Sequence, residues 1–244
     1  GAGRLVTPAL STTIDRLLIG QIRPFGPNGE PSAIAKQPVD HPLLAGPFGL
    51  VGDRQADTRH HGGPDKAIHH YPAKHYAAWA EDCPQLPPAA LQPGGFGENI
   101  SCLGLDESNV CVGDVFRCGS SLLQVSQARQ PCWKLAQRFG IADMPLRVQL
   151  TGRSGWYYRV LEPGTIEVGC PLQLLERPYP QWPLQRLLQL LYHDCLNQPG
   201  LQAMAALEVL PDNWRELALR RLQTAQVEDW SRRLTIPETQ GTHR

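Results

Sequence analysis

The chain of 244 residues is long enough for one large domain with a well-buried core. Its 23 Gly and 23 Pro follow no period, which favours a β-rich fold with many turns over a helical bundle or a disordered chain. Lys and Arg together number 23, as do Asp and Glu, so the formal net charge is zero. Without a global basic field, we expect no nucleic-acid partner.

The cysteines and the distribution of apolar residues indicate the cellular compartment. Seven cysteines are present, an odd number, and no Cys-x-x-Cys pair occurs. A complete disulfide framework and a zinc knuckle are therefore both unexpected, and free thiols in a reducing compartment fit best. The first residues show no signal-peptide pattern, and nowhere do 18 apolar residues run together. We expect a soluble, cytoplasmic protein without a membrane partner.

The first two thirds of the chain show the pattern of short strands between turns. Strands are predicted over 16–22 and 31–36, and a buried strand over 67–71. A helix is predicted from Pro72 to Trp79, because the missing N–H of proline costs nothing in a first helical turn. The later strands are predicted over 115–117, 122–125, 156–161, 165–168 and 172–175. Short strands at this spacing predict a closed or nearly closed barrel over residues 14–177.

After Pro180 the pattern becomes helical. Leucines at 184, 187, 188 and 191 recur at steps of three and four residues, and two further helical stretches follow. We predict a three-helix appendage over residues 181–234. Its leucines form either a small core packed on the barrel or a contact between two copies, so a homodimer stays open.

Cys132 is the most informative candidate for chemistry. A predicted strand runs into a short loop, and Pro131 then opens a helix that covers Trp133 to Phe139. Cys132 would lie in the first helical turn, where unpaired N–H groups and the helix macrodipole favour a thiolate. Arg129 and Lys134 add positive charge nearby. A thiolate suits a soft metal or an electrophile. The alternative is a small buried side chain without chemistry.

A second candidate is the run from His61 to Lys66. Gly62 and Gly63 let the backbone turn tightly, so that its N–H groups point at one place and bind an anion. Lys66 could neutralise a phosphate, and Asp65 could hold a polar ring N–H. An ordinary turn is the alternative interpretation.

The histidines and one further motif complete the candidates. The pairs at 60–61 and 69–70 are adjacent, and His69 and His70 point to opposite faces of a strand, so no dedicated zinc site is expected. The segment Phe96-Gly97-Glu98-Asn99 places a glycine and two polar side chains at a strand start. These residues either line a pocket or cap a turn.

Taken together, these segments resemble the MOSC-domain family, named after the C-terminal domain of molybdenum-cofactor sulfurase, and within it the YiiM-type branch. Singly each match is unspecific, but six in family order make a specific signal. Ala128 stands where the family pattern has a proline, which changes the stiffness of the loop. The matching segments are 31–36, 49–53, 61–66, 70–72, 96–99 and 126–135.

The resemblance implies a fold, a cofactor and a reaction. The fold is β-rich (α+β), a MOSC-type β-barrel with peripheral helices and a small C-terminal three-helix appendage. The cofactor is a molybdopterin-type molybdenum cofactor with Cys132 as the ligand of molybdenum. The reaction is reduction of small N-hydroxylated compounds such as 6-hydroxylaminopurine. The candidates to hold the cofactor are Lys36, Arg54, Gly62, Gly63, Lys66 and Arg129. The candidates for the substrate side are His61, Asp65, Glu98 and Asn99.

The source of electrons and two rival interpretations remain. The chain holds no motif for a flavin, a haem or an iron–sulfur cluster, so we expect a separate electron-donating reductase. In one rival interpretation, Cys132 carries persulfide sulfur or the protein delivers cofactor without turnover. In the other, the protein is a metal-free thiol enzyme or an interaction domain.

Overall fold

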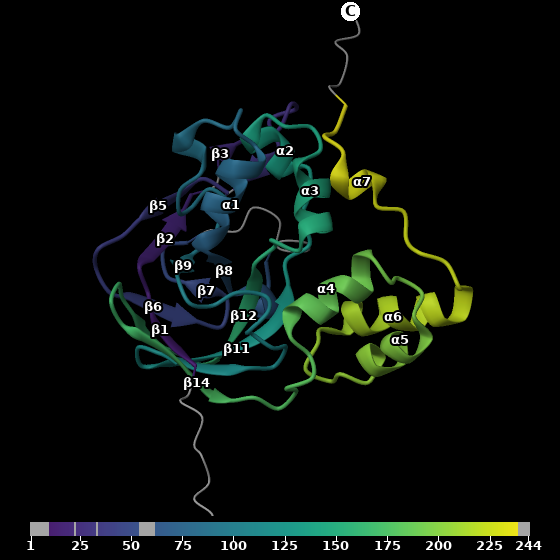
Figure 1. Ribbon diagram of the computed structural model, residues 1–244. Helices are drawn as coiled ribbons and strands as arrows, with labels where there is room; N and C mark the ends of the chain where they lie inside the picture. Colours follow the sequence, from purple (N-terminus) through teal and green to yellow (C-terminus); the bar gives the residue numbers. More distant parts are fainter. Residues whose placement is uncertain (1–9, 22, 33, 54–61, 239–244) are drawn as a thin grey trace, which may run out of the picture.

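The computed structural model describes residues 10–21, 23–32, 34–53 and 62–238. Its body is one curled sheet of nine strands (Figure 1). Neighbouring strands are antiparallel except at one step, β8 to β9. In spatial order the strands are β1 (Ser11–Thr13), β14 (Pro171–Glu176), β10 (Val115–Cys118), β11 (Ser121–Ala128), β12 (Trp156–Glu162), β8 (Ile68–Pro72), β9 (Ile100–Cys102), β2 (Arg16–Gly20) and β5 (Lys36–Pro38).

Chain connectivity bends this sheet into a half-barrel. Two residues, Ile14 and Asp15, separate β1 from β2. Yet β1 lies at one end of the strand order and β2 next to the other end, so the sheet must curl round on itself. This confirms the predicted β-rich α+β class. Two short ribbons accompany the sheet: β13 (Gly164–Ile166) with β6 (Leu43–Gly46) and β7 (Gly49–Leu50), and β3 (Arg23–Pro24) with β4 (Pro31–Ser32).

Three peripheral helices lie together over one end of the half-barrel (Figure 1). They are α1 (Lys74–Asp82), α2 (Lys134–Phe139) and α3 (Met144–Thr151), and two short 3-10 turns are η1 (Pro64–Lys66) and η2 (Pro88–Ala90). Phe96 is central to their core. Its ring stacks on Tyr71 at 4.1 Å and lies 5.0 Å from Phe139. This core therefore ties the segment before Glu98 to the helix that follows Cys132.

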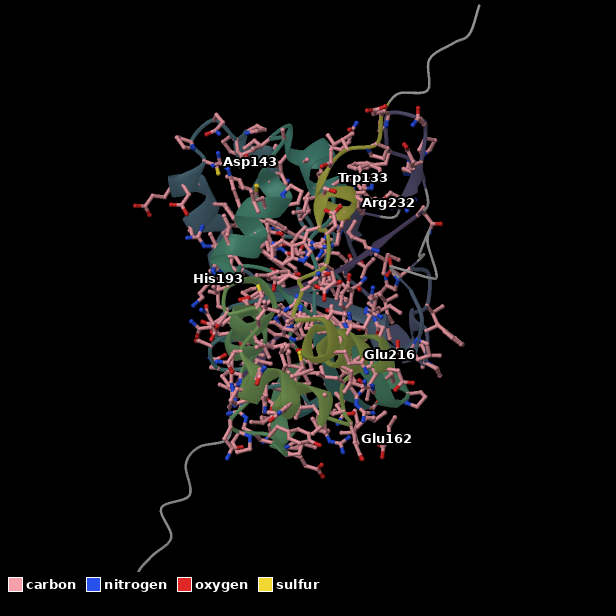
Figure 2. All side chains as sticks on the ribbon, turned by 90° about the vertical axis from the view of Figure 1, so that its right-hand side faces the viewer. Trp133, Asp143, Glu162, His193, Glu216 and Arg232 are labelled. Carbon is pink, nitrogen blue, oxygen red and sulfur yellow. The ribbon has the colours of Figure 1, made fainter. Side chains whose placement is uncertain are left out.

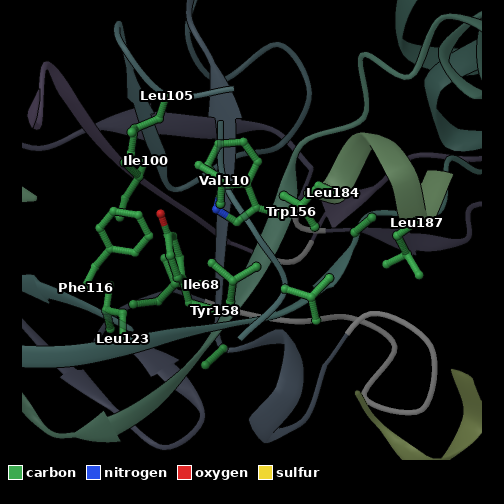
Figure 3. Packing of buried hydrophobic residues seen from close by; sticks show 14 of the residues in the cluster. Ile68, Ile100, Leu105, Val110, Phe116, Leu123, Trp156, Tyr158, Leu184 and Leu187 are labelled. Atoms are coloured by element: carbon green, nitrogen blue, oxygen red, sulfur yellow. The ribbon is translucent and has the colours of Figure 1, made fainter. Parts of the chain in front are cut away.

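The C-terminal region is helical, as predicted. It contains α4 (Leu184–Tyr192), α5 (Gln198–Ala205), α6 (Asp212–Thr224) and, after an extended stretch, α7 (Ser231–Leu234). The leucines of α4 pack in the same core as the barrel, and Figure 3 shows Leu184 and Leu187 near Val110 and Trp156. The domain bounds 14–177 and 181–234 stay a prediction, because the two parts share this core. No helix in the described part of the chain is long and apolar enough to cross a membrane.

Two local predictions are wrong. Residues 31–36 do not form one strand, because β4 ends at Ser32 and a separate β5 begins at Lys36. Pro72 closes β8 instead of opening the helix: it pairs with Cys102 in parallel register, and α1 begins at Lys74. Pro72 needs no N–H at this position, because the N–H of the next residue, Ala73, donates to the Cys102 carbonyl at 3.0 Å.

We predict that the barrel and the helices α4 to α6 unfold in one cooperative transition. Leu187→Ala removes a fully buried side chain from their shared core and should lower the free energy of unfolding by about 3 kcal/mol. Leu219→Ala is the control, because Leu219 is 47% exposed and its loss should cost less than about 0.5 kcal/mol. Urea unfolding followed by both tryptophan fluorescence and circular dichroism checks this, and two separated transitions would contradict it.

Candidate functional site

Cys132 lies in the short loop between β11 and α2. Its side chain is 8% exposed. The helix begins at Lys134, so Cys132 precedes the first helical turn, and the prediction that it lies within that turn is wrong. The Cys132 carbonyl still accepts the Leu135 N–H at 3.1 Å, which ties the residue to the start of α2.

Arg129 is buried in the same loop and is fixed at both ends. Its backbone N–H donates to the Gly155 carbonyl at 3.1 Å, and its guanidinium Nη1 donates to the Phe96 carbonyl at 2.6 Å. Burial raises the pKa of Tyr157, while the charges of Arg129 and Cys132 act on the same hydroxyl in opposite directions. Arg129, Cys132 and Tyr157 therefore form one electrostatic neighbourhood.

His69 is a member of this neighbourhood that the sequence did not single out. Its ring lies 5.0 Å from the Tyr157 ring. Burial, followed by the charge of Arg129, holds the His69 pKa well below 6.5, so the ring is neutral at pH 7. Its Nε2 is buried and has no hydrogen-bond partner among the described residues.

The Gly97 backbone acts to raise the His69 pKa, but burial outweighs this effect and the ring stays neutral. His70, on the opposite face of β8, is instead enclosed by Tyr158 and Cys102 in the barrel core.

Lys66, in the glycine-rich turn, lies near the Tyr157 ring. Its ammonium lies 5.7 Å from the centroid of the Tyr157 ring. Gly63 has φ 93°, a region that favours glycine, and its carbonyl accepts the Lys66 N–H at 3.1 Å. Gly62 directly precedes this turn and is half-buried. His60, His61 and Arg54 lie outside the described residues.

Lys36 and Asn99 meet at Asp53. The Lys36 ammonium lies 2.7 Å from Asp53 Oδ1, with both side chains buried. Asn99 Nδ2 donates to the other carboxylate oxygen at 2.8 Å. The charge of Lys36 also contributes to the low pKa of His69, so this ion pair lies close to the His69 ring.

The carboxyl groups of Glu98 and Asp65 each bond to another side chain. Glu98 is fully buried and accepts a hydrogen bond from the Tyr76 hydroxyl at 2.5 Å, and burial raises its pKa to about 7. Asp65 Oδ1 lies 2.9 Å from Arg159 Nε. The substrate-side roles of these two carboxyl groups stay a prediction.

The potential metal ligands of the described residues do not gather in one cluster. All seven cysteines are free. No group of three or more His, Cys, Asp or Glu side chains in the described ranges is arranged to hold a metal ion. His75, at the start of α1, is paired with Glu107 at 2.5 Å.

Comparison with known proteins places the chain in a family. Residues 57–173 match the family described as MOSC domain, and residues 182–225 match the YiiM-like, 3-alpha helix domain. Protein YiiM of Escherichia coli (strain K12) is 40% identical over 215 residues, which are 88% of this chain and 95% of that protein. The chain belongs to the MOSC-domain family, in its YiiM-type branch.

Two further matches extend this assignment. The crystal structure of YiiM from Escherichia coli superposes with a TM-score of 0.75 at 34% identity, over 88% of this chain and 99% of that one. A protein named Reductase from Gibberella moniliformis (strain M3125 / FGSC 7600) is 37% identical over 211 residues, 84% of this chain but 36% of that protein. Membership of the MOSC family indicates a role related to the molybdenum cofactor.

We predict that Glu98 makes the stability of this MOSC protein fall between pH 4.5 and pH 7. Burial raises its pKa from 4.5 to about 7, so the folded protein holds this proton more tightly than the unfolded chain does. Wild-type stability should then decline by on the order of 2–3 kcal/mol relative to Glu98→Gln as pH rises through that window. Urea unfolding of both proteins at several pH values measures this difference. A difference that does not change with pH would contradict the prediction.

Proposed function

We propose that this protein is a molybdenum-cofactor-dependent reductase of N-hydroxylated compounds such as 6-hydroxylaminopurine. The observation that carries the proposal is the neighbourhood of Tyr157, where a thiol, two cations and an unpartnered ring nitrogen come together. Family membership and the relative named Reductase support the redox assignment.

The side chains fit such a cofactor. Cys132 offers the single soft ligand that molybdenum takes from the protein, and it is shielded from bulk water. Arg129 and Lys66 supply positive charge for an anionic phosphate or dithiolene group. The buried Nε2 of His69 can accept an N–H, which both a pterin and a purine present.

The positions of these residues assign each of them a role in the proposed reaction. A molybdenum centre bound at Cys132 would supply the two-electron chemistry for converting an N-hydroxylated amine to the amine and water. Arg129 cannot swing away from its place, because the Phe96 and Gly155 carbonyls hold both its ends. His69 stays neutral at pH 7 and so orients a ring N–H without adding charge. The electrons come from a separate reductase, and we place the reaction in the cytoplasm.

We predict that bound molybdenum depends on Cys132. Protein purified from a host that makes molybdenum cofactor should contain close to one molybdenum per chain, and Cys132→Ala should retain less than about a tenth of that amount. Cys195→Ala is the matched control, because Cys195 lies in the helical appendage and its thiol bonds the Leu191 carbonyl. Metal analysis and pterin fluorescence measure both components. Metal-free wild-type protein from such a host would overturn the proposal and leave a metal-free thiol protein.

We further predict turnover of 6-hydroxylaminopurine to adenine. The loaded protein, supplied with a chemical electron donor such as reduced methyl viologen, should form adenine at a rate at least about a hundredfold above that of Cys132→Ala. Chromatographic measurement of adenine tests this. Full molybdenum content without turnover of any N-hydroxylated base or amidoxime would favour the carrier interpretation instead.

A further inference from the structure

Residues 226 to 238 form a C-terminal strap that leaves the helical appendage and crosses to the Cys132 loop. Figure 1 shows this segment in yellow, running from α6 up to α7 beside α2 and α3. At its start, Glu228 accepts three hydrogen bonds from the buried Arg221 of α6, the shortest of them 2.7 Å. Near its end, the Glu238 carbonyl accepts a bond from Asn28 Nδ2 at 2.9 Å. The strap is thus fastened on both sides of α7.

Between these fastenings, Arg233 contacts both peptide groups that flank Cys132. The Arg233 carbonyl accepts the N–H of Trp133 at 2.7 Å, which belongs to the peptide group after Cys132. Its guanidinium Nη1 donates to the Pro131 carbonyl, which belongs to the peptide group before Cys132. Figure 2 shows Trp133 beside Arg232, the neighbour of Arg233 on the strap.

The guanidinium of Arg233 is itself held in place. Its Nη2 donates to Gln149 Oε1 at 2.9 Å, and Gln149 is buried in α3. The ring of Tyr192 at the end of α4 lies 5.7 Å below it, and the Trp230 ring of the strap packs edge-on against that tyrosine. Arg233 therefore links α3 and α4 to the loop that contains Cys132.

We propose that Arg233 is a positioning residue that fixes the direction of the Cys132 thiol. A peptide group is planar, so holding the planes on both sides of a Cα also fixes its Cβ. The side chain of Cys132 then keeps one free rotation, about χ1. The other side of the loop is closed as well: a Cβ at Gly26 would come within 2.8 Å of the Trp133 ring. This inference rests on the proposed function for its purpose, namely presenting a ligand thiolate to molybdenum.

The reactivity of Cys132 in metal-free protein tests the positioning role without any cofactor. Arg233→Ala removes the bond to Pro131 while leaving the backbone carbonyl, so the loop should open more often and iodoacetamide should alkylate Cys132 about tenfold faster or more. Arg233→Lys, which keeps one donor, should fall between the two. Arg232→Ala is the matched control, because Arg232 neighbours Arg233 on α7 and is exposed. Peptide mass spectrometry resolves the seven thiols.

A merely structural role predicts a different pattern. General destabilisation would accelerate alkylation at the buried Cys102 as much as at Cys132, and that result would overturn the proposal. Equal Cys132 rates in wild type and Arg233→Ala would overturn it too. A specific effect at Cys132 supports it, and in a cofactor-replete host Arg233→Ala should then retain several-fold less molybdenum than Arg232→Ala. If wild-type protein binds no molybdenum while the thiol effect is present, the cofactor assignment fails and the positioning role stands.

Discussion

The buried amide of Asn99 joins strands at the one place where the sheet changes from antiparallel to parallel pairing. Its Oδ1 accepts the backbone N–H of His69 in β8, and its Nδ2 donates to the Leu18 carbonyl in β2 and to Asp53. Both amide hydrogens are therefore used inside the protein. An unpartnered buried polar group costs about 1–3 kcal/mol, so removing this side chain would leave several groups unsatisfied at once. Asn99 therefore holds both the backbone of His69 and the carboxylate of the Lys36–Asp53 pair.

Several cations lie near Asn99, His69 and Tyr157, although the formal net charge of the protein is zero. Arg129 acts on both His69 and Tyr157, and the Lys66 ammonium lies 5.7 Å from the Tyr157 ring. The charge of Lys36 also reaches His69, although Asp53 pairs with it. Burial keeps His69 neutral in this field, because a second positive charge there would lack both solvent and a carboxylate partner. The proposed function requires a small anionic ligand, and a local basic site on a protein without net charge suits such a ligand better than a polyanion.

Much of the fold was predictable because its signals are local. The strands predicted over 115–117 and 122–125 lie within β10 and β11, which Gly119 and Ser120 join in a tight turn. The role of the Cys132 thiol stays a prediction from its neighbours within ten residues, one of which, Arg129, acts together with Cys132 on Tyr157. The helix α3 was not predicted, although Pro145 lies in its first turn, a position that favours proline.

The rest of the site depends on contacts between distant parts of the chain. Alternation along β8 predicts that His69 and His70 face opposite sides, but it does not predict which side holds Arg129. Arg233 has no local signal at all, since it is one of several arginines in a polar C-terminal stretch and its bonding partner lies 102 residues earlier. Residues of this kind are visible only once the chain has folded.

The separation of 102 residues between Pro131 and Arg233 affects the order in which the chain folds during synthesis. A chain emerging from the ribosome presents Cys132 and its loop well before Arg233, and domains generally begin to fold from the N-terminal side. The half-barrel can therefore collapse around a cysteine loop that still lacks its outer support. Docking of the strap would be a late step on the folding route, slow because the contact spans so much chain. A newly made protein would pass through an interval with an open loop, in which the proposed cofactor would reach Cys132 most easily.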